Sequence, residues 1–253
     1  MLSAEELEKY RADGYVTPDF RLPERDLEDI RAHHGRLVSR HPEYRDYCPN
    51  LLAHDLAFLN WARVPEILDM VEQVIGPDIA LWNSSFFAKP ALNGRKTPWH
   101  QDGEYWPLRP LATCTVWIAV DASTQENGCL NVLRGSHRDK RLRAHNTNDD
   151  PSYTLNQELR EDEFDEDLAA PIELEAGQVS LHDVYLVHGS EANNSPKPRR
   201  GMTLRYMPTT SVFDREIASR LAREKGLVDH AERTLFLMRG EDRSGRNDFR
   251  IRL

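Results

Sequence analysis

Two residues in the stretch TPWHQDGEYW, residues 97–106, have the types and the spacing of metal ligands. The aromatic residues around them predict a strand, and on a strand residues i and i+2 point to the same side. His100 and Asp102 are therefore expected to present an imidazole and a carboxylate to one face. A His-x-Asp pair also occurs by chance as an ordinary hydrogen-bonded pair, so this spacing alone leaves both interpretations open.

His188 is the third candidate ligand, near the end of the apolar stretch LHDVYLVHGS, residues 181–190. Two histidines and one carboxylate form the facial triad typical of non-haem iron(II) oxygenases, which leaves coordination positions open for other ligands. His182 and Asp183 compete for the same role, but neighbours on a strand point to opposite faces, so both cannot join one site. We expect His182 to be a hydrogen-bonded residue at a strand end rather than a ligand.

Arg199 and Ser190 make the triad more specific. After His188 a polar turn leads into the next predicted strand, so the chain returns antiparallel and brings Arg199 beside His188. A guanidinium binds a carboxylate in bidentate fashion. The distal carboxylate of 2-oxoglutarate needs such an anchor when its 2-oxo acid end chelates a metal, and the Ser190 hydroxyl can donate to the same carboxylate.

Two functions without 2-oxoglutarate remain open on the triad alone. A β-barrel can bind a metal or another ligand without turnover, and a cupin-type barrel can use a metal to activate water as a hydrolase or isomerase. Neither function needs a carboxylate anchor beside the third metal ligand. Arg199 with Ser190 therefore favours the oxygenase.

The elements that position these residues begin with helices. Ser3 and Glu6 form a capping-box pattern at the start of a short helix. Apolar residues at helical spacing predict further helices over 23–41 and 64–75, the second of which ends at Gly76. The N-terminal region, residues 1–76, is therefore expected to be helical.

From residue 77 to residue 210 the pattern predicts strands. The apolar stretches there, of which residues 79–89 are the longest, are short or alternating and rich in β-branched and aromatic residues, with Gly, Pro, Asn and Asp between them. The polar segment 138–170 reads as an insertion with one helix near 155–163, and a long loop of this kind is a candidate lid. Residues 211–253 form a C-terminal extension that includes a helix. We expect one domain over 1–253, mainly β with flanking helices.

Composition limits the partners and the compartment. The chain has 253 residues and a formal net charge of −9, which argues against nucleic acid because phosphate neutralisation dominates that binding. Its three cysteines, Cys48, Cys114 and Cys129, show neither a disulfide framework nor zinc-ribbon spacing. No signal-peptide pattern and no long apolar run occur, so we expect a cytoplasmic protein without a membrane partner. The sequence leaves the oligomeric state open.

Taken together, these motifs resemble the phytanoyl-CoA dioxygenase family of iron(II)/2-oxoglutarate-dependent oxygenases. The matching stretches are DGYV (13–16), PEIL…IGPDIALWNSSFFAKP (65–90), WHQDGEYWPLRP (99–110), CTVWIAVD (114–121), ENGCLNVLRGSH (126–137) and HGS…NNSPKPRRGMTLRYMPTT (188–210). The resemblance implies a double-stranded β-helix (jelly-roll, cupin-like) core. It also implies Fe(II) as cofactor, 2-oxoglutarate as cosubstrate, and O2 with a small molecule as the substrates.

Residue by residue, the resemblance implies a complete site. The family's metal ligands fall on His100, Asp102 and His188, and its 2-oxoglutarate contacts fall on Arg199, Ser190, Trp117 and Ser85. The sequence departs from the family in lacking the lysine that some members place near residues 47–52, and in having Arg134 where proline is usual. Related halogenases have a small residue at the position of Asp102, so a carboxylate there favours hydroxylation or another oxidative outcome over halogenation.

The substrate side is less defined. Asn83, Ser85 and Phe87 alternate on one predicted strand, so one face is expected to line the cavity while Trp82 and Phe86 pack outside. Strand parity also assigns Trp106 and Arg205 to the substrate pocket. A small polar metabolite or natural-product intermediate is the expected substrate, because a fatty acyl-CoA would need basic surface for its phosphates.

Overall fold

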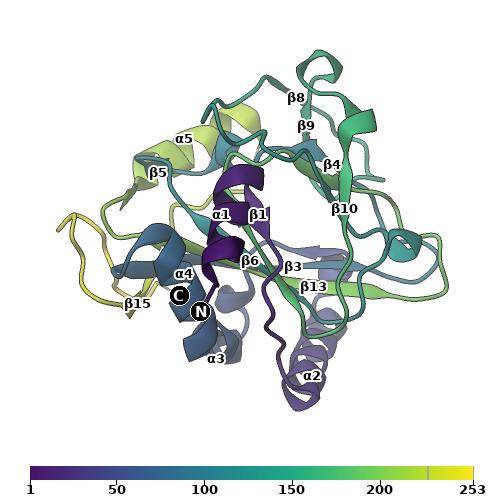
Figure 1. Cartoon of the computed structure of the whole chain (residues 1–253), viewed down its shortest axis with the longest axis horizontal. Helices are drawn as coiled ribbons and strands as arrows, with labels where there is room; N and C mark the ends of the chain where they lie inside the picture. The colour runs from purple at the N-terminus through teal and green to yellow at the C-terminus, as the bar shows by residue number, and fades with distance from the viewer. Residues whose placement is uncertain (227, 253) are drawn as a thin grey trace.

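Two main antiparallel sheets with helices packed around them form the core of the protein (Figure 1). The computed structural model describes residues 1–226 and 228–252. Within these residues the α-helices are α1 (Ala4–Asp13), α2 (Glu24–Arg40), α3 (Leu59–Ala62), α4 (Pro65–Ile75) and α5 (Arg215–Lys225). The strands are β1 (Tyr15–Val16), β2 (Tyr47–Cys48), β3 (Ile79–Lys89), β4 (Thr97–His100), β5 (Leu108–Arg109), β6 (Cys114–Ala119), β7 (Leu130–Val132), β8 (His145–Thr147), β9 (Gln157–Leu159), β10 (Ala170–Ile172), β11 (Val179–Asp183), β12 (His188–Ser190), β13 (Arg199–Pro208), β14 (Val212–Phe213) and β15 (Phe236–Arg239). Besides the two main sheets, two further sheets, β14-β5 and β8-β9, have two strands each. The prediction of a mainly β fold with flanking helices is confirmed.

The predicted N-terminal helices form where their patterns lie. At α1 the Ser3 hydroxyl accepts from the Glu6 amide and the Glu6 carboxylate accepts from the Ser3 amide, so the capping box is complete. The helix ends at Gly14, whose φ of 84° is a left-handed conformation that glycine adopts readily. The N-terminal region also contributes strands: β1 pairs with β11 and β2 pairs with β3.

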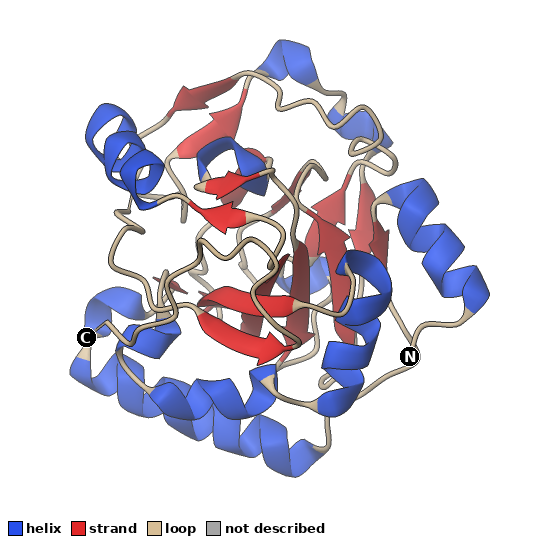
Figure 2. Cartoon of the chain, turned by 90° about the vertical axis from the view of Figure 1, so that its left-hand side faces the viewer, coloured by secondary structure: helices blue, strands red, loops and turns tan. Residues whose placement is uncertain are grey.

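The larger sheet has the order β1-β11-β6-β13-β3-β15, with β2 also paired to β3. Helices α2 and α4 pack on its outer face, where Ile30 and Val71 meet Phe86 and Leu204 in one buried cluster. Figure 2 shows helices against one side of the central strands. This packing makes the sheet a rigid support for the side chains on its inner face.

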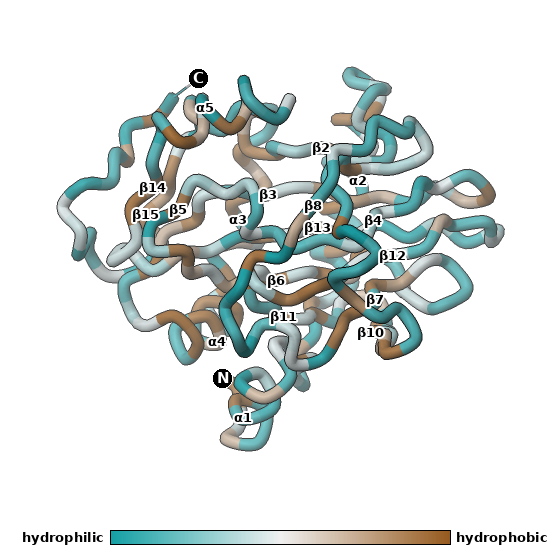
Figure 3. The backbone as a smooth tube through the Cα atoms, turned by 90° about the horizontal axis from the view of Figure 1, so that it is seen from above, coloured by the Kyte–Doolittle hydropathy of each residue, from teal (hydrophilic) through white to brown (hydrophobic). Residues whose placement is uncertain are grey.

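The smaller sheet, β10-β7-β12-β4, faces the inner side of the larger one. Trp117 of β6 packs with Val132 of β7 in a cluster that joins the two sheets. This arrangement is the predicted double-stranded β-helix. In Figure 3 the β6 strand carries hydrophobic residues, whereas the tube near β8 is largely polar.

The strand that carries His100 is shorter than predicted. Strand β4 ends at His100, which pairs with His188, the first residue of β12. Beyond that point β12 offers no further partner, and Asp102 instead begins the short 3₁₀ helix Asp102–Tyr105. The prediction of one strand through Asp102 was therefore wrong, although the two side chains still lie together.

The insertion 138–170 forms a hairpin and not the predicted helix. Strand β9 pairs with β8, and the 3₁₀ turn Glu161–Glu163 follows. Leu159 packs with Trp99 and Val187 in a buried cluster. Tertiary packing therefore overrides the helix propensity of this polar segment.

The prediction that Trp82 packs outside the sheet was wrong, because the alternation along β3 changes there. The ladder between β3 and β13 shifts register between Arg205 and Tyr206, opposite Asn83 and Leu81. Trp82 is the extra residue of this bulge. Its indole meets the Trp106 ring edge to face at 4.8 Å, whereas Phe86 packs under the helices as expected.

No helix among the described residues combines the length and the apolar character that a membrane crossing requires.

Candidate active site

His100, Asp102 and His188 come together between the two sheets. Each offers one ligand atom, and these atoms all lie within 4.8 Å of one another. His100 Nε2 lies 3.6 Å from Asp102 Oδ1, and the two histidine rings are 4.2 Å apart. All three side chains are buried. Within the described part of the chain this is the one such group of His, Cys, Asp and Glu side chains.

Both histidines are held in the tautomer that a metal needs. Nδ1 of His100 donates to the Pro98 carbonyl at 2.8 Å, and Nδ1 of His188 donates to the Leu186 carbonyl at 2.9 Å. A carbonyl oxygen can only accept, so Nδ1 carries a proton in each ring and Nε2 is the nitrogen left to bind a metal. Such hydrogen bonds fix the orientation of metal-ligating histidines.

Asp102 and His188 are both in the protonation state of a ligand. Burial by itself raises the pKa of the Asp102 carboxyl, but the charge of Arg205, together with the neighbouring His100 and His182 rings, brings that pKa well below its usual value. Burial is the main reason that the pKa of His188 lies well below its usual value. A carboxylate and a neutral imidazole result at neutral pH.

Arg199, the first residue of β13, lies beside this group and is 3% exposed. Its Nε and Nη2 donate to the Gly128 carbonyl at 3.2 and 2.9 Å, while Nη2 is 3.4 Å from Ser190 Oγ and Nη1 is 3.4 Å from the Phe87 carbonyl. Burial lowers the pKa of Arg199 to about 10, so the guanidinium stays charged at neutral pH. Within residues 1–226 and 228–252 no carboxylate forms an ion pair with it.

Trp117 of β6 supports Arg199 from one side, with the guanidinium carbon 5.4 Å from the centre of the indole ring. The indole occupies the space next to Gly201, where a Cβ would lie only 2.1 Å from Trp117 Cζ2. Gly201 therefore has a packing reason to lack a side chain, and Trp117 and Arg199 form a stacked pair.

The residues predicted from sequence divide between two cavities. A narrow cavity contains the three candidate ligands together with Arg199, Ser190, Trp117, Phe87 and Arg205. A larger cavity of about 470 Å³ is lined by Asn83 and Trp106, and Arg205 lines it too. The fully buried Ser85 lines neither cavity, and its hydroxyl accepts from Arg205 Nη1 at 2.6 Å. Its role as a 2-oxoglutarate contact stays a prediction.

The presence of His182 in the cavity of the candidate ligands was not predicted from the sequence. His182 is buried, lines the narrow cavity, and its Nε2 lies 3.8 Å from Asp102 Oδ2. Its strand β11 pairs with β6 so that His182 stands opposite Thr115, two residues from Trp117 and on the same face. Side chains alternate between the two faces along β6, so the position of Trp117 indicates which face His182 lies on. This can be used only once the pairing of β11 with β6 is known.

Two features of the structure test whether iron(II) and 2-oxoglutarate fit here. Two imidazoles and one carboxylate that meet at one point are the donor set of a non-haem iron(II) site with open positions. The buried Arg199 guanidinium lines the same cavity without a carboxylate partner among the described residues. A buried charge of this kind calls for a counter-ion, so a metal-chelating dicarboxylate fits both ends of the cavity.

Comparisons with known proteins agree with this geometry. The family model described as phytanoyl-CoA dioxygenase (PhyH) matches residues 1–201. The chain is 32% identical over 161 residues to the peroxisomal phytanoyl-CoA dioxygenase of Homo sapiens, covering 60% of this chain and 46% of that protein. It is 30% identical over 149 residues to a probable alpha-ketoglutarate-dependent hypophosphite dioxygenase of Stutzerimonas stutzeri, covering 57% and 50%. The chain spans about half the length of the curated relatives it matches.

Solved structures resemble the chain over most of its length. The apo form of the non-heme monooxygenase ThoJ superposes with a TM-score of 0.74 at 26% identity, covering 97% of this chain and 88% of that chain. The non-heme alpha ketoglutarate dependent carbocyclase SnoK from nogalamycin biosynthesis gives a TM-score of 0.67 at 25% identity, covering 84% and 87%. The fold around the candidate site is thus shared with these proteins.

Proposed function

We propose an activity from the premise that the chain belongs to the phytanoyl-CoA dioxygenase (PhyH) family. The protein is an iron(II)- and 2-oxoglutarate-dependent oxygenase that hydroxylates an unactivated C–H bond of a small polar metabolite or natural-product intermediate. The reaction consumes one O2 and one 2-oxoglutarate and releases succinate and carbon dioxide. The hypophosphite dioxygenase and the carbocyclase SnoK, both described as alpha-ketoglutarate-dependent, support the cosubstrate.

The observation that carries the proposal is the position of Arg199. A buried guanidinium without a carboxylate partner in the described residues shares a cavity with the His100, Asp102 and His188 side chains. A cupin-type hydrolase or a non-catalytic binding barrel has no use for a carboxylate anchor at this place. The dicarboxylate cosubstrate of an oxygenase does.

Each side chain then has a defined task. His100, Asp102 and His188 would hold iron(II), and the backbone carbonyls of Pro98 and Leu186 keep the two imidazoles oriented. When bound, iron with 2-oxoglutarate supplies the oxygen activation that a protein side chain cannot perform.

The anchoring residues bind and orient the cosubstrate. Arg199 would bind its distal carboxylate, with the Ser190 hydroxyl as a second donor. Trp117 stacks on the guanidinium and limits its movement. Apart from Asp102, which begins a 3₁₀ helix, these side chains lie on strands of the β core, which restricts the positions that bound groups can take.

Succinate formation tests the proposal. We expect the purified protein with iron(II), 2-oxoglutarate and O2 to form succinate slowly even without its substrate. Asp102→Asn should abolish this turnover. Asp183→Asn is the matched control, because Asp183 is a carboxylate on β11 that does not line the narrow cavity. Iron binding without any succinate in the wild-type protein would move the assignment to the binding-module or hydrolase alternatives.

Two broader predictions accompany this activity. We propose that residues 1–253 act as one oxygenase domain, which is supported by the buried cluster that joins the N-terminal helices to the larger sheet. A cytoplasmic location remains a prediction from the sequence.

A further inference from the structure

The larger cavity, of about 470 Å³, lies next to the candidate metal ligands and is of a size that small-molecule ligands occupy. Among residues 1–226 and 228–252, Arg205 is the side chain that lines both this cavity and the narrow one. A molecule in the larger cavity that reaches toward the metal ligands therefore meets the Arg205 guanidinium. The charge and the hydrogen-bond donors of this guanidinium therefore indicate which group the substrate presents to it.

Arg205 is fixed in place but is not fully hydrogen-bonded. It is 4% exposed, its Nη1 donates to Ser85 Oγ at 2.6 Å, and its buried Nε has no hydrogen-bond partner among the described residues. The guanidinium carbon lies 5.0 Å from the centre of the Trp106 ring. Its one carboxylate neighbour, Asp102 at 3.9 Å from Nη2, is a candidate metal ligand. Arg205 thus retains N–H groups that a ligand can use.

A second buried arginine adds positive charge behind the cavity wall. Arg233 is 4% exposed and donates only to neutral acceptors: His230 Nδ1 at 2.6 Å, the Asn83 side-chain carbonyl, and the Pro49 carbonyl at 2.9 Å. Burial lowers its pKa to about 10, so it stays charged at neutral pH. In the described part of the chain no carboxylate forms an ion pair with Arg233.

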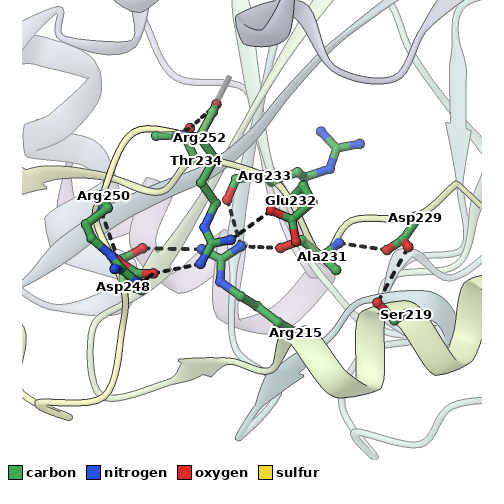
Figure 4. Close-up of polar contacts among 10 residues, drawn as sticks. All are labelled: Arg215, Ser219, Asp229, Ala231, Glu232, Arg233, Thr234, Asp248, Arg250 and Arg252. Carbon is green, nitrogen blue, oxygen red and sulfur yellow. Dashed lines mark hydrogen bonds and ion pairs between the residues drawn. The ribbon is translucent and has the colours of Figure 1, made fainter.

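Hydrogen bonds and ion pairs hold the segment that carries His230 and Arg233 in place. Arg215 of α5 donates to the backbone carbonyls of Ala231 and Arg233, and Arg252 pairs with Glu232 and Asp248 (Figure 4). The second positive charge is therefore held at a constant position. Arg233 has no carboxylate partner among the described residues, and the one partner of Arg205, Asp102, is also a candidate metal ligand. The two guanidinium charges therefore favour an anion at the end of the cavity near Arg205.

The rest of the cavity differs in character. Its walls carry five aromatic side chains from three segments of the chain: Tyr44, Tyr47, Tyr105, Trp106 and Tyr153. Glu43, Asp149 and Asp150 line it on the solvent side, where all three are exposed. These carboxylates would repel a second negative charge at the far end of a ligand. They therefore disfavour an acyl-CoA, whose nucleotide carries negatively charged phosphates.

We propose that the substrate is a small monocarboxylate with a flat, largely apolar body, whose carboxylate binds Arg205 and whose body lies between the aromatic walls. This inference rests on the proposed function, because it takes the metal-ligand end of the cavity as the place of reaction. A carboxylate matches the planar fork of a guanidinium better than other small groups do. Aromatic walls bind a flat body by stacking.

Paired probes test the proposal. Protein loaded anaerobically with iron(II) and saturating 2-oxoglutarate is titrated by calorimetry with phenylacetate, 3-phenylpropionate and indole-3-carboxylate, and with the neutral amide of each. We expect at least one carboxylate to bind about tenfold or more tightly than its amide, which is the size of one charge-assisted hydrogen bond. The preference should fall below about threefold in Arg205→Met and persist in part in Arg205→Lys.

Arg200→Met is the matched control, because Arg200 lies on the opposite face of the same strand, pairs with Asp121 and lines neither cavity. It should keep the preference for carboxylates. Three results would each overturn the proposal. The wild type could bind acids and amides equally, it could bind none of the three acids, or Arg205→Met could keep the full preference for acids. A failure of the proposed function can be told apart from a failure of this inference. It would be seen before the titration, because the iron-loaded protein would not bind 2-oxoglutarate.

Discussion

Replacement of Arg199 by methionine perturbs the candidate cosubstrate anchor and little else. The guanidinium is 3% exposed, and its contacts are with the carbonyls of Gly128 and Phe87 and with the Ser190 hydroxyl. Methionine keeps an apolar stem of similar length beside Trp117. The protein is therefore expected to fold, while the bound dicarboxylate loses its charged partner.

The size of the effect follows from burial. Removal of one partner from a buried, hydrogen-bonded charge pair costs about 2–5 kcal/mol, which corresponds to roughly 30- to 4,000-fold in Kd. We therefore expect Arg199→Met to weaken 2-oxoglutarate binding to the iron-loaded protein by at least about 30-fold. Ser190→Ala removes a single neutral donor and should cost about 1 kcal/mol, or roughly fivefold.

Anaerobic isothermal titration calorimetry measures both effects. Arg200→Met is the control, because Arg200 lies on the opposite face of the same strand and pairs with Asp121 at 2.7 Å. Its Kd for 2-oxoglutarate should match that of the wild type. If folded Arg199→Met binds 2-oxoglutarate within about threefold of the wild type, the anchor has been assigned to the wrong residue.

Three further predictions follow from particular contacts. Gly201→Ala places a Cβ against Trp117 and should cost about 1–3 kcal/mol of unfolding free energy, together with weaker 2-oxoglutarate binding; an unchanged urea midpoint would contradict the packing. His34 stacks on Phe86, and burial lowers its pKa from the usual 6.5 to about 4 in the folded protein. As the pH falls, the His34 side chain of the unfolded chain is therefore protonated before that of the folded protein. Stability should therefore drop by about 2 kcal/mol between pH 7 and pH 5, a loss that urea titrations should find largely absent in His34→Gln. Residues 148–150 and 153–157 line the larger cavity, so a bound aromatic carboxylate should slow their amide hydrogen exchange, and unchanged exchange would count against a lid.

The alternation of strands explains how far the site could be predicted. Arg199 and Arg205 are on one face of β13 at even spacing, and the two line the same cavity because no bulge lies between them. His188 was recognisable because it ends an apolar stretch before glycine. In each case a local pattern decides which side of a sheet a residue faces.

The parts that could not be predicted depend on which segments become neighbours. The bulge at Trp82 arises from the register with β13 and turns that indole toward Trp106. Ser85 has the right parity for the cavity, yet its hydroxyl is taken by Arg205. Arg233 lies in a stretch without clear periodicity, so its contact with Asn83 has no signal in the local sequence.

The central claim is that one cavity binds iron(II) through His100, Asp102 and His188 and 2-oxoglutarate through Arg199. The most direct measurement is an anaerobic titration of the metal-free protein with iron(II) and then 2-oxoglutarate, followed by visible absorption. We predict a weak charge-transfer band from the iron–2-oxo acid chelate that is absent in His188→Ala. Iron bound without such a band, or a band that survives in His188→Ala, would contradict the claim.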